Sequence, residues 1–248
     1  MITIDKSTEM TDANMTSNPP QAPRRAIQAT AQGARKKRSG DRLGREDWVR
    51  VARLCLIRAG IEGIKVERLA IRLKVTTGSF YWHFKKLGDL HEALLLDWYE
   101  TNTASFHRAV ERAGPDPRQQ YLVFLGTWVL EKDFDPRYDR AVRDWARQSK
   151  KVASLLSKVD TDRMNLLQNI FEAFGYSGRD AEMRARVAYY HQVGYYALDA
   201  REPNDVRVGL GPGYARILTG YDFLEDLSLD DLKEAFAGRY VFVEPFTL

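Results

Sequence analysis

Cysteine is almost absent from the sequence, which excludes a disulfide-stabilised fold. Cys55 is the only cysteine in 248 residues, so no disulfide can form within the chain. It lies in the apolar run VARLCLIRA, which predicts a buried helix residue rather than a reactive thiol. We therefore expect a fold that depends on its apolar core, in a reducing compartment.

Long apolar runs are also missing. No window reaches the roughly 18 to 20 apolar residues that a membrane-spanning helix needs, and the polar N-terminus has no apolar core of a signal peptide. We therefore expect no membrane partner and a cytoplasmic protein, which would be associated with the nucleoid if it binds DNA.

Motifs of catalysis and metal binding are missing as well. The chain has no Gly-x-Ser-x-Gly elbow, and GLGPG at 209–213 is too short for a phosphate loop and lacks the lysine and hydroxyl residue that follow. The histidines show no metal-ligand spacing with a cysteine or carboxylate; they are His83, His91, His107 and His191. The sequence thus predicts no enzyme, no metal site and no cofactor.

Acidic residues are scarce only in the first third of the chain. Residues 1–45 contain nine basic and four acidic residues, and residues 46–91 contain nine and five. The remaining 157 residues contain 20 basic and 25 acidic residues, so all the net positive charge lies before residue 92. This segregation predicts a polyanionic partner for the N-terminal part.

Residues 1–42 are rich in Thr, Ser, Asn, Pro and Gln and contain few large apolar residues, which predicts a disordered basic arm. Its ARKKR cluster, residues 34–38, would add non-specific contacts to phosphates. The alternative is a solubilising tail or a vector-derived extension.

Apolar periodicity predicts three short helices after this arm. Thr76 is a suitable N-cap for the third, which would direct Phe80 and Phe84 into the core. Because the link at residues 74–76 is tight, the last two helices describe a helix-turn-helix whose final helix enters the major groove of DNA. The expected helices are 45–59, 66–73 and 77–84.

The stretch SFYWHFK, residues 79–85, would then be the recognition helix and its edge. Residues expected at the bases are Thr77, Ser79 and Trp82, and those expected at backbone phosphates are Tyr81, His83, Lys85 and Lys86. Other roles stay open: Tyr81 half-buried among the helices, His83 bridging two helices, and Trp82 as an exposed lid.

Helical periodicity continues to the C-terminus, and no alternation typical of a strand is sustained except at the extended tail VFVEPFTL. The fold class is therefore all-α. The expected helices are 87–113, 118–131, 136–148, 152–174, 180–199 and 206–219, with a short acidic helix in LSLDDLKEAFAG.

Residues 45–99 resemble the DNA-binding domain of the TetR/AcrR family of bacterial transcriptional regulators. The resemblance rests on Ala59-Gly60 and on VERLAIRLKVTTGSFYWHFKKLGDL, where the family shows Val-x-x-Ile-Ala-x-x-x-x-Val-Ser-x-Gly-x-x-Tyr-x-His-Phe. The matching residues are Val66, Leu69, Ala70, Val75, Thr76, Gly78, Tyr81, His83 and Phe84. The resemblance implies a DNA-binding domain at 43–91 and a helical effector-binding and dimerisation domain at 92–248.

Three departures from the family pattern affect the expected phosphate contacts. Ile64-Lys65 replaces the usual capping hydroxyl, so that Lys65 would act by charge, and Lys74 replaces the glycine that usually precedes Val75. Leu87 occupies the position of the usual phosphate-contacting lysine, and that role moves to Lys85 or Lys86.

The resemblance further implies a homodimer that binds a palindromic operator and is released, most simply as a repressor, when a small molecule binds. Helices 180–199 and 206–219 would form the dimer bundle, and helix 87–113 would connect the domains. Candidate effector-pocket residues are Trp128, Trp145, Arg143, Asp144, His191, Gln192 and Tyr195. The alternative is a helical architectural protein that binds DNA without an effector, which a solid C-terminal core would favour.

Overall fold

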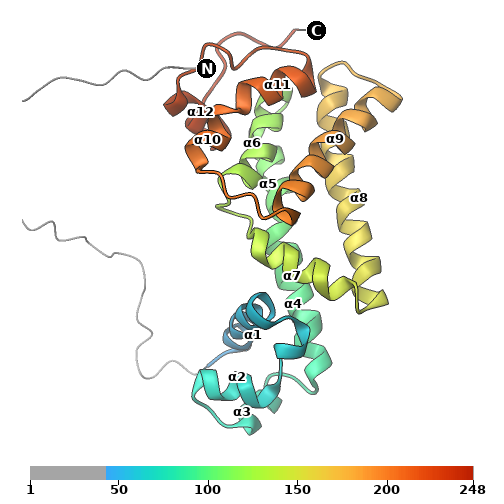
Figure 1. Cartoon of the computed structure of the whole chain (residues 1–248), viewed down its shortest axis with the longest axis vertical. Coiled ribbons are helices and arrows are strands. Elements are labelled where there is room, and N and C mark those ends of the chain that lie inside the picture. Colours follow the sequence, from blue (N-terminus) through green and yellow to red (C-terminus); the bar gives the residue numbers. More distant parts are fainter. Residues whose placement is uncertain (1–42, 248) are drawn as a thin grey trace, which may run out of the picture. The chain divides into compact units, whose positions relative to one another are not determined.

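The computed structural model describes residues 43–247. All regular elements in this range are helices, which confirms the predicted all-α fold (Figure 1). None of these helices is long and apolar enough to span a membrane. The predictions for the basic arm, residues 1–42, and for residue 248 lie outside the described residues.

The first two helices have the predicted bounds because their apolar positions repeat at three and four residues. They are α1 (Arg45–Ala59) and α2 (Val66–Leu73), separated by the 3-10 turn η1 (Ile61–Gly63). Cys55 is buried in α1, as predicted.

The third helix, α3 (Thr77–Tyr81), is shorter than the predicted span to Phe84. The backbone N–H of Phe84 nevertheless donates to the carbonyl of Phe80 at 3.0 Å, so this turn keeps helical geometry. Both phenylalanines are therefore buried on one side, where Phe80 meets the ring of Trp48 edge-on at 5.3 Å. Thr76 is the N-cap residue, but its side chain makes no capping hydrogen bond.

The turn between α2 and α3 depends on a left-handed residue. Lys74 has φ 58° and ψ 43°, a conformation that glycine adopts without steric cost and that a side chain penalises. This geometry lets Val75 N–H donate to the carbonyl of Ala70 at 3.0 Å, which closes the end of α2.

Replacing Lys74 by glycine is expected to raise the free energy of unfolding by about 1 kcal/mol, because the steric cost at the left-handed position disappears. Urea denaturation would measure the change. Lys158→Gly is the matched control: Lys158 lies exposed within a regular helix, so that substitution should destabilise the protein by a similar amount. An equal loss in both variants would contradict the prediction.

The predicted connector helix 87–113 is wrong as a single helix. The structure has α4 (Leu87–Asn102) and α5 (Ala104–Ala113), separated at Thr103, whose φ is −125°. The sequence TNTAS around this point is rich in side chains that compete for backbone hydrogen bonds. The Asn102 carbonyl accepts a hydrogen bond from the buried Arg163 instead of from the next helical turn.

The next four helices agree with their predicted bounds within two residues. They are α6 (Pro117–Val129), α7 (Pro136–Ala146), α8 (Lys150–Ala173) and α9 (Gly178–Ala197). Asp116 and Asp135 cap α6 and α7 by accepting backbone N–H groups, and each is followed by a proline in the first turn. Helices α8 and α9 run side by side (Figure 1).

The predicted helix 206–219 is also two helices, α10 (Asn204–Gly209) and α11 (Gly211–Thr219). Pro212 favours a new helix start, and a Cβ at Gly211 would lie 2.9 Å from the ring of Phe236, so close packing fixes this break. The short acidic helix is α12 (Leu229–Phe236). The tail after it has no regular structure through residue 247.

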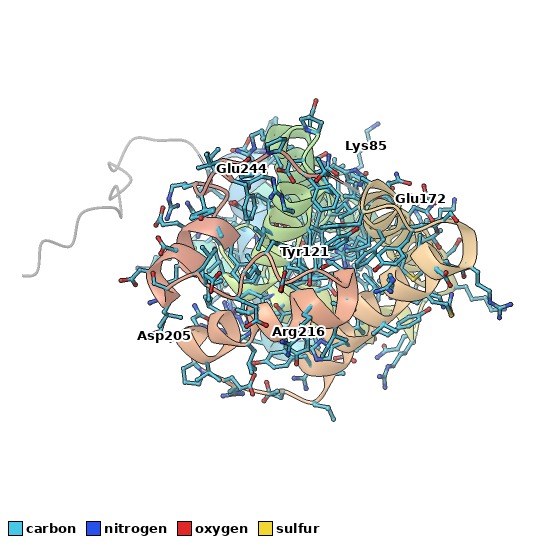
Figure 2. The ribbon with its side chains drawn as sticks, turned by 90° about the horizontal axis from the view of Figure 1, so that it is seen from above. Lys85, Tyr121, Glu172, Asp205, Arg216 and Glu244 are labelled. Atoms are coloured by element: carbon cyan, nitrogen blue, oxygen red, sulfur yellow. The ribbon has the colours of Figure 1, made fainter. Side chains whose placement is uncertain are left out.

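Two clusters of buried apolar side chains hold these helices together. One cluster joins α1 to α4 with α7 and the start of α8, and it includes Trp48, Phe80 and Trp98. The other lies among α5, α6, α8, α9 and the C-terminal helices. Tyr121, labelled in Figure 2, belongs to this cluster and is buried.

Candidate nucleic-acid interface and ligand pocket

Two large aromatic side chains are exposed at the C-terminal end of α3, the second helix of the helix-turn-helix. Tyr81 is 61% exposed and Trp82 is 87% exposed, although Phe80 between them and the core is fully buried. Thr76, Thr77 and Gly78 are exposed at the start of α3. Ser79 and His83 are half-buried. Every predicted recognition residue is therefore accessible or partly accessible.

Three lysines, one before α2 and two after α3, have no salt-bridge partner among the described residues. Lys65 is exposed at the start of α2, whereas the neighbouring Ile64 is buried and serves the core. Lys85 and Lys86 are exposed after α3, and their backbone N–H groups donate to the Asp89 carboxylate at 3.0 and 3.2 Å. Asp89 thus caps α4 and leaves both ammonium groups available.

The predicted effector residues do not form one site. Trp128, Arg143 and Asp144 line a pocket of about 300 Å³ among α6, α7, α8 and α9, and Gln192 lines it too. Trp145 packs elsewhere, with its ring edge-on to His91 at 5.4 Å in the cluster that contains α1 and α4.

His191 and Tyr195 line a different pocket, of about 160 Å³, next to α10 and α11. The Tyr214 hydroxyl lies 3.1 Å from Nε2 of His191 at the exposed side of this pocket. Gln192 lies on the wall between the two pockets, because it lines both.

A polar network among residues that line the 300 Å³ pocket was not predicted from the sequence. Arg143 donates from Nε to Asp139 at 2.8 Å and from Nη1 and Nη2 to Asp160 at 3.0 and 2.7 Å. The Tyr189 hydroxyl donates to the same Asp160 carboxylate at 2.6 Å. Charges from α7 and α8 and a phenol from α9 therefore satisfy one another in a partly buried site.

Arg163 extends this network to the break between α4 and α5. Its side chain is 1% exposed, and Nη2 donates to the Asn102 carbonyl at 2.9 Å, to Thr103 Oγ1 at 2.9 Å and to Asp139 Oδ1 at 3.1 Å. The Trp98 indole donates to the same Asp139 oxygen at 3.1 Å. The sequence does contain one signal for the burial of Arg163. This residue occupies the core-facing row of α8, where the apolar periodicity places buried side chains.

The charged groups within this network shift one another's pKa values. Burial alone would raise the pKa of Asp139, but the guanidinium groups of Arg163 and Arg143 outweigh burial and hold that pKa below its ordinary value. The same carboxylate raises the pKa of Arg143 and of Arg163 against the effect of burial. All three groups are therefore charged at neutral pH.

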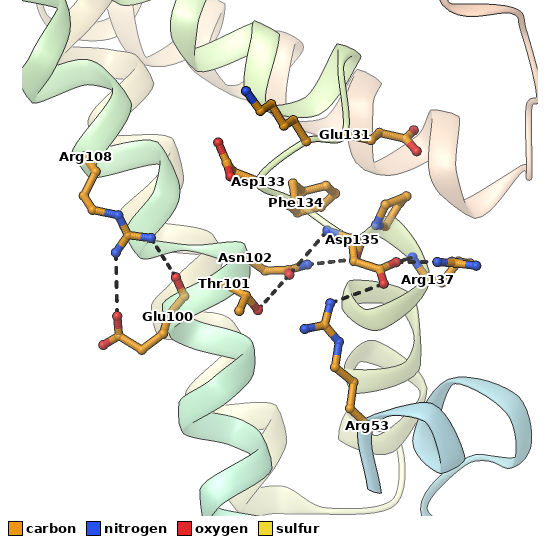
Figure 3. A pocket seen from close by; sticks show the side chains of 12 residues that line it. Arg53, Glu100, Thr101, Asn102, Arg108, Glu131, Asp133, Phe134, Asp135 and Arg137 are labelled. Carbon is orange, nitrogen blue, oxygen red and sulfur yellow. Dashed lines mark hydrogen bonds and ion pairs between the residues drawn. The ribbon is translucent and has the colours of Figure 1, made fainter. Parts of the chain in front are cut away.

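A second group of polar contacts, made by Arg53, connects α1 with α4 and with the start of α7. Arg53 of α1 lies 3.4 Å from Asp135 and 3.8 Å from Asp97, and its guanidinium stacks 4.5 Å from the centre of the Tyr138 ring. Figure 3 shows Arg53 pointing toward Asp135, beside Asn102, whose amide donates to the Asp135 carbonyl at 2.8 Å. Helix α7 thus contacts α1, through Arg53, and lines the pocket, through Arg143.

Neither a protein-family model nor a curated protein sequence matches the chain. Among solved structures, the fold is similar to that of a transcriptional regulator from Rhodococcus sp. Rha1. The TM-score is 0.53 and the identity 20%, with 75% of this chain and all of that chain covered. Identity at this level shows a shared helical fold.

Proposed function

We propose that this chain is a DNA-binding transcriptional regulator of the TetR/AcrR type, with α3 as its recognition helix. The observation that carries the proposal is the exposed pair Tyr81 and Trp82 on the second helix of a helix-turn-helix, flanked by the free lysines Lys85 and Lys86. Aromatic and hydroxyl groups reach base edges from such a helix, and lysines neutralise phosphates at its edges. The structural likeness to a transcriptional regulator agrees with this proposal.

The proposed contacts divide into two classes. Thr77, Ser79 and Trp82 contact bases, and Gly78, which has no side chain, allows the start of α3 to approach the groove closely. Phosphate contacts come from both ends of the helix-turn-helix; the proposed residues are Lys65, Thr76, Tyr81, His83, Lys85 and Lys86. The proposed DNA-binding domain spans residues 43–91, and residues 92–248 form the effector-binding and dimerisation domain.

Helices α9 and α11 support a proposed homodimer. Met183, Val187 and Tyr190 follow one another at four- and three-residue spacing on α9 and are 41%, 57% and 49% exposed. Tyr214 and Ile217 of α11 are also exposed. Burial of these apolar side chains against a second copy would pair two recognition helices for the half-sites of a palindromic operator.

Release of the DNA when a small molecule binds is proposed from the position of the 300 Å³ pocket. The 300 Å³ pocket lies over residues of α7 and α8 that contact α4, the helix that follows the recognition helix. A ligand that prefers one arrangement of these helices would change the spacing of the two recognition helices and so the affinity for DNA. Repression that ends when the ligand binds is the simplest outcome.

Selection of binding sites from random duplex DNA tests the proposal. The intact protein is expected to recover one palindrome, and Tyr81→Ala and His83→Ala are expected to bind it about tenfold or more weakly, because each loses a hydrogen bond to a charged phosphate. His107→Ala is the matched control, since His107 bonds Asp162 on α8 and should leave DNA affinity unchanged.

Two outcomes would overturn this function. Binding without a preferred sequence that disappears as salt is raised would favour the architectural protein, because non-specific association depends on counterion release. A recovered site without two-fold symmetry would contradict the homodimer.

A further inference from the structure

Two residues that line the pocket among α6–α9 each have a buried nitrogen donor without a partner among the described residues. They are Nε of Arg163 and Nε2 of Gln192, whose side chains are 1% and 9% exposed. A buried donor left unsatisfied costs about 1–3 kcal/mol, so such groups in a pocket indicate a ligand that accepts hydrogen bonds. Both residues line this pocket.

The walls of the pocket are aromatic. Trp128, Phe134, Tyr189 and Tyr196 line it, and the two tyrosine hydroxyls are already used: Tyr189 donates to Asp160 and Tyr196 donates to the Trp128 carbonyl. The remaining ring surface is apolar. The ligand body that fits this wall is therefore an apolar ring or chain.

The charged groups at the pocket favour an anion over a neutral acceptor. Arg143 and Arg163 share the Asp139 carboxylate, and Arg140 and Arg147 line the pocket with only loose partners, at 4.0 Å from Asp199 and 3.8 Å from Asp144. Exposed pairs at these distances contribute little, so both outer arginines remain available to attract a negative group.

We propose that this pocket binds a small organic carboxylate with an apolar body, whose oxygens accept hydrogen bonds from Arg163 Nε and the Gln192 amide. That this compound is the effector rests on the proposed function, whereas its binding to the pocket does not. A carboxylate bonded to Arg163 Nε adds a second anion beside the guanidinium whose Nη2 already donates to Asp139, Asn102 and Thr103. Ligand binding therefore acts directly on the junction of α4 and α5.

Calorimetry with the full chain and without DNA tests this inference. The probes are benzoate, 2-naphthoate, 4-phenylbutyrate and decanoate, each compared with its neutral amide. At least one acid is expected to bind tenfold or more tightly than its amide, which lacks the charge. Gln192→Leu should weaken that acid about tenfold without lowering the thermal midpoint, because the variant removes an unsatisfied buried donor.

Two bulky substitutions identify the pocket. Val193 lines only the proposed site, and Leu210 lines only the pocket next to α11. Val193→Phe should abolish binding of the acid, whereas Leu210→Phe should leave it unchanged. The inference is overturned if every acid has a Kd above about 1 mM, if amides bind as well as acids, or if only Leu210→Phe blocks binding. DNA selection is independent of these readouts, so each hypothesis can fail alone.

Discussion

Asp139→Asn is expected to lower the free energy of unfolding by about 3–5 kcal/mol, the usual cost of removing one partner from a buried ion pair. The carboxylate accepts from Arg143 at 2.8 Å, from Arg163 at 3.1 Å and from Trp98 at 3.1 Å. Asparagine keeps the size of the side chain but removes the charge, so Arg163 remains buried with no ion-pair partner among the described residues.

The pH dependence of this effect has a definite sign. The folded-state pKa of Asp139 is depressed, so its stabilisation is fully present above the ordinary carboxyl pKa and is lost as the pH falls through the lower folded-state pKa. The difference between the variant and the original protein should therefore be largest at neutral pH and shrink in acid.

Urea denaturation at neutral and acidic pH measures both quantities. Asp144→Asn is the matched control, because Asp144 lies on the same helix with an exposed side chain and a loose partner at 3.8 Å. That variant should change stability by less than about 1 kcal/mol. If both variants unfold alike, the buried network does not contribute as the contacts indicate.

The helix-turn-helix was predictable because its signals are local. Periodic apolar residues define α1 and α2, Gly60 ends α1, and the predicted bounds match those observed. The placement of Phe80 and Phe84 in the core also followed from their four-residue spacing. The left-handed geometry of Lys74 was not predicted, because residue identity does not indicate it there.

The breaks at Thr103 and Leu210 were missed because tertiary contacts decide them. A buried arginine from α8 satisfies the carbonyl that helix continuation would have used at the first break, and Phe236 packs against Gly211 at the second. Neither contact is local in sequence.

The candidate pocket was predicted only in part for the same reason. Arg143, Trp128 and Gln192 do line it, but His191 and Tyr195 lie in the neighbouring pocket and Trp145 packs beside His91. Aromatic content identifies residues suited to a pocket or a core without assigning them to one helix face. Packing between helices makes that assignment.

The polar network around Asp139 and the polar contacts of Arg53 connect the stability of α7 with the proposed response to a ligand. Asp139 and Arg143 belong to α7, which also contacts α1 through Arg53 and Asp135. Ordered side chains hold α7 against both α4 and α8, so a ligand that changes their partners acts on a rigid element rather than on a flexible loop. The large expected cost of Asp139→Asn and the proposed carboxylate response have this common origin.

Gly126→Ala is expected to lower the free energy of unfolding by about 3 kcal/mol or more, through overpacking at the contact of α6 with α12. A Cβ at Gly126 would overlap the carbonyl oxygen of Phe236 and lie 2.8 Å from its carbonyl carbon. Both atoms belong to the backbone, so no side-chain rotation relieves the clash. Helix α12 must therefore move away from α6 and expose Leu232 and Phe236, which are buried in the cluster around Tyr121.

Gly213→Ala separates this clash from the general effect of an added methyl group. A Cβ at Gly213 meets no atom within 4 Å, and alanine favours the helix there, so stability should stay level or rise by up to about 1 kcal/mol. Urea denaturation compares the two variants, and hydrogen exchange of residues 229–236 shows whether α12 is the part that loosens. Equal midpoints for the two variants would mean that α6 and α12 tolerate a separation that their close backbone contact argues against.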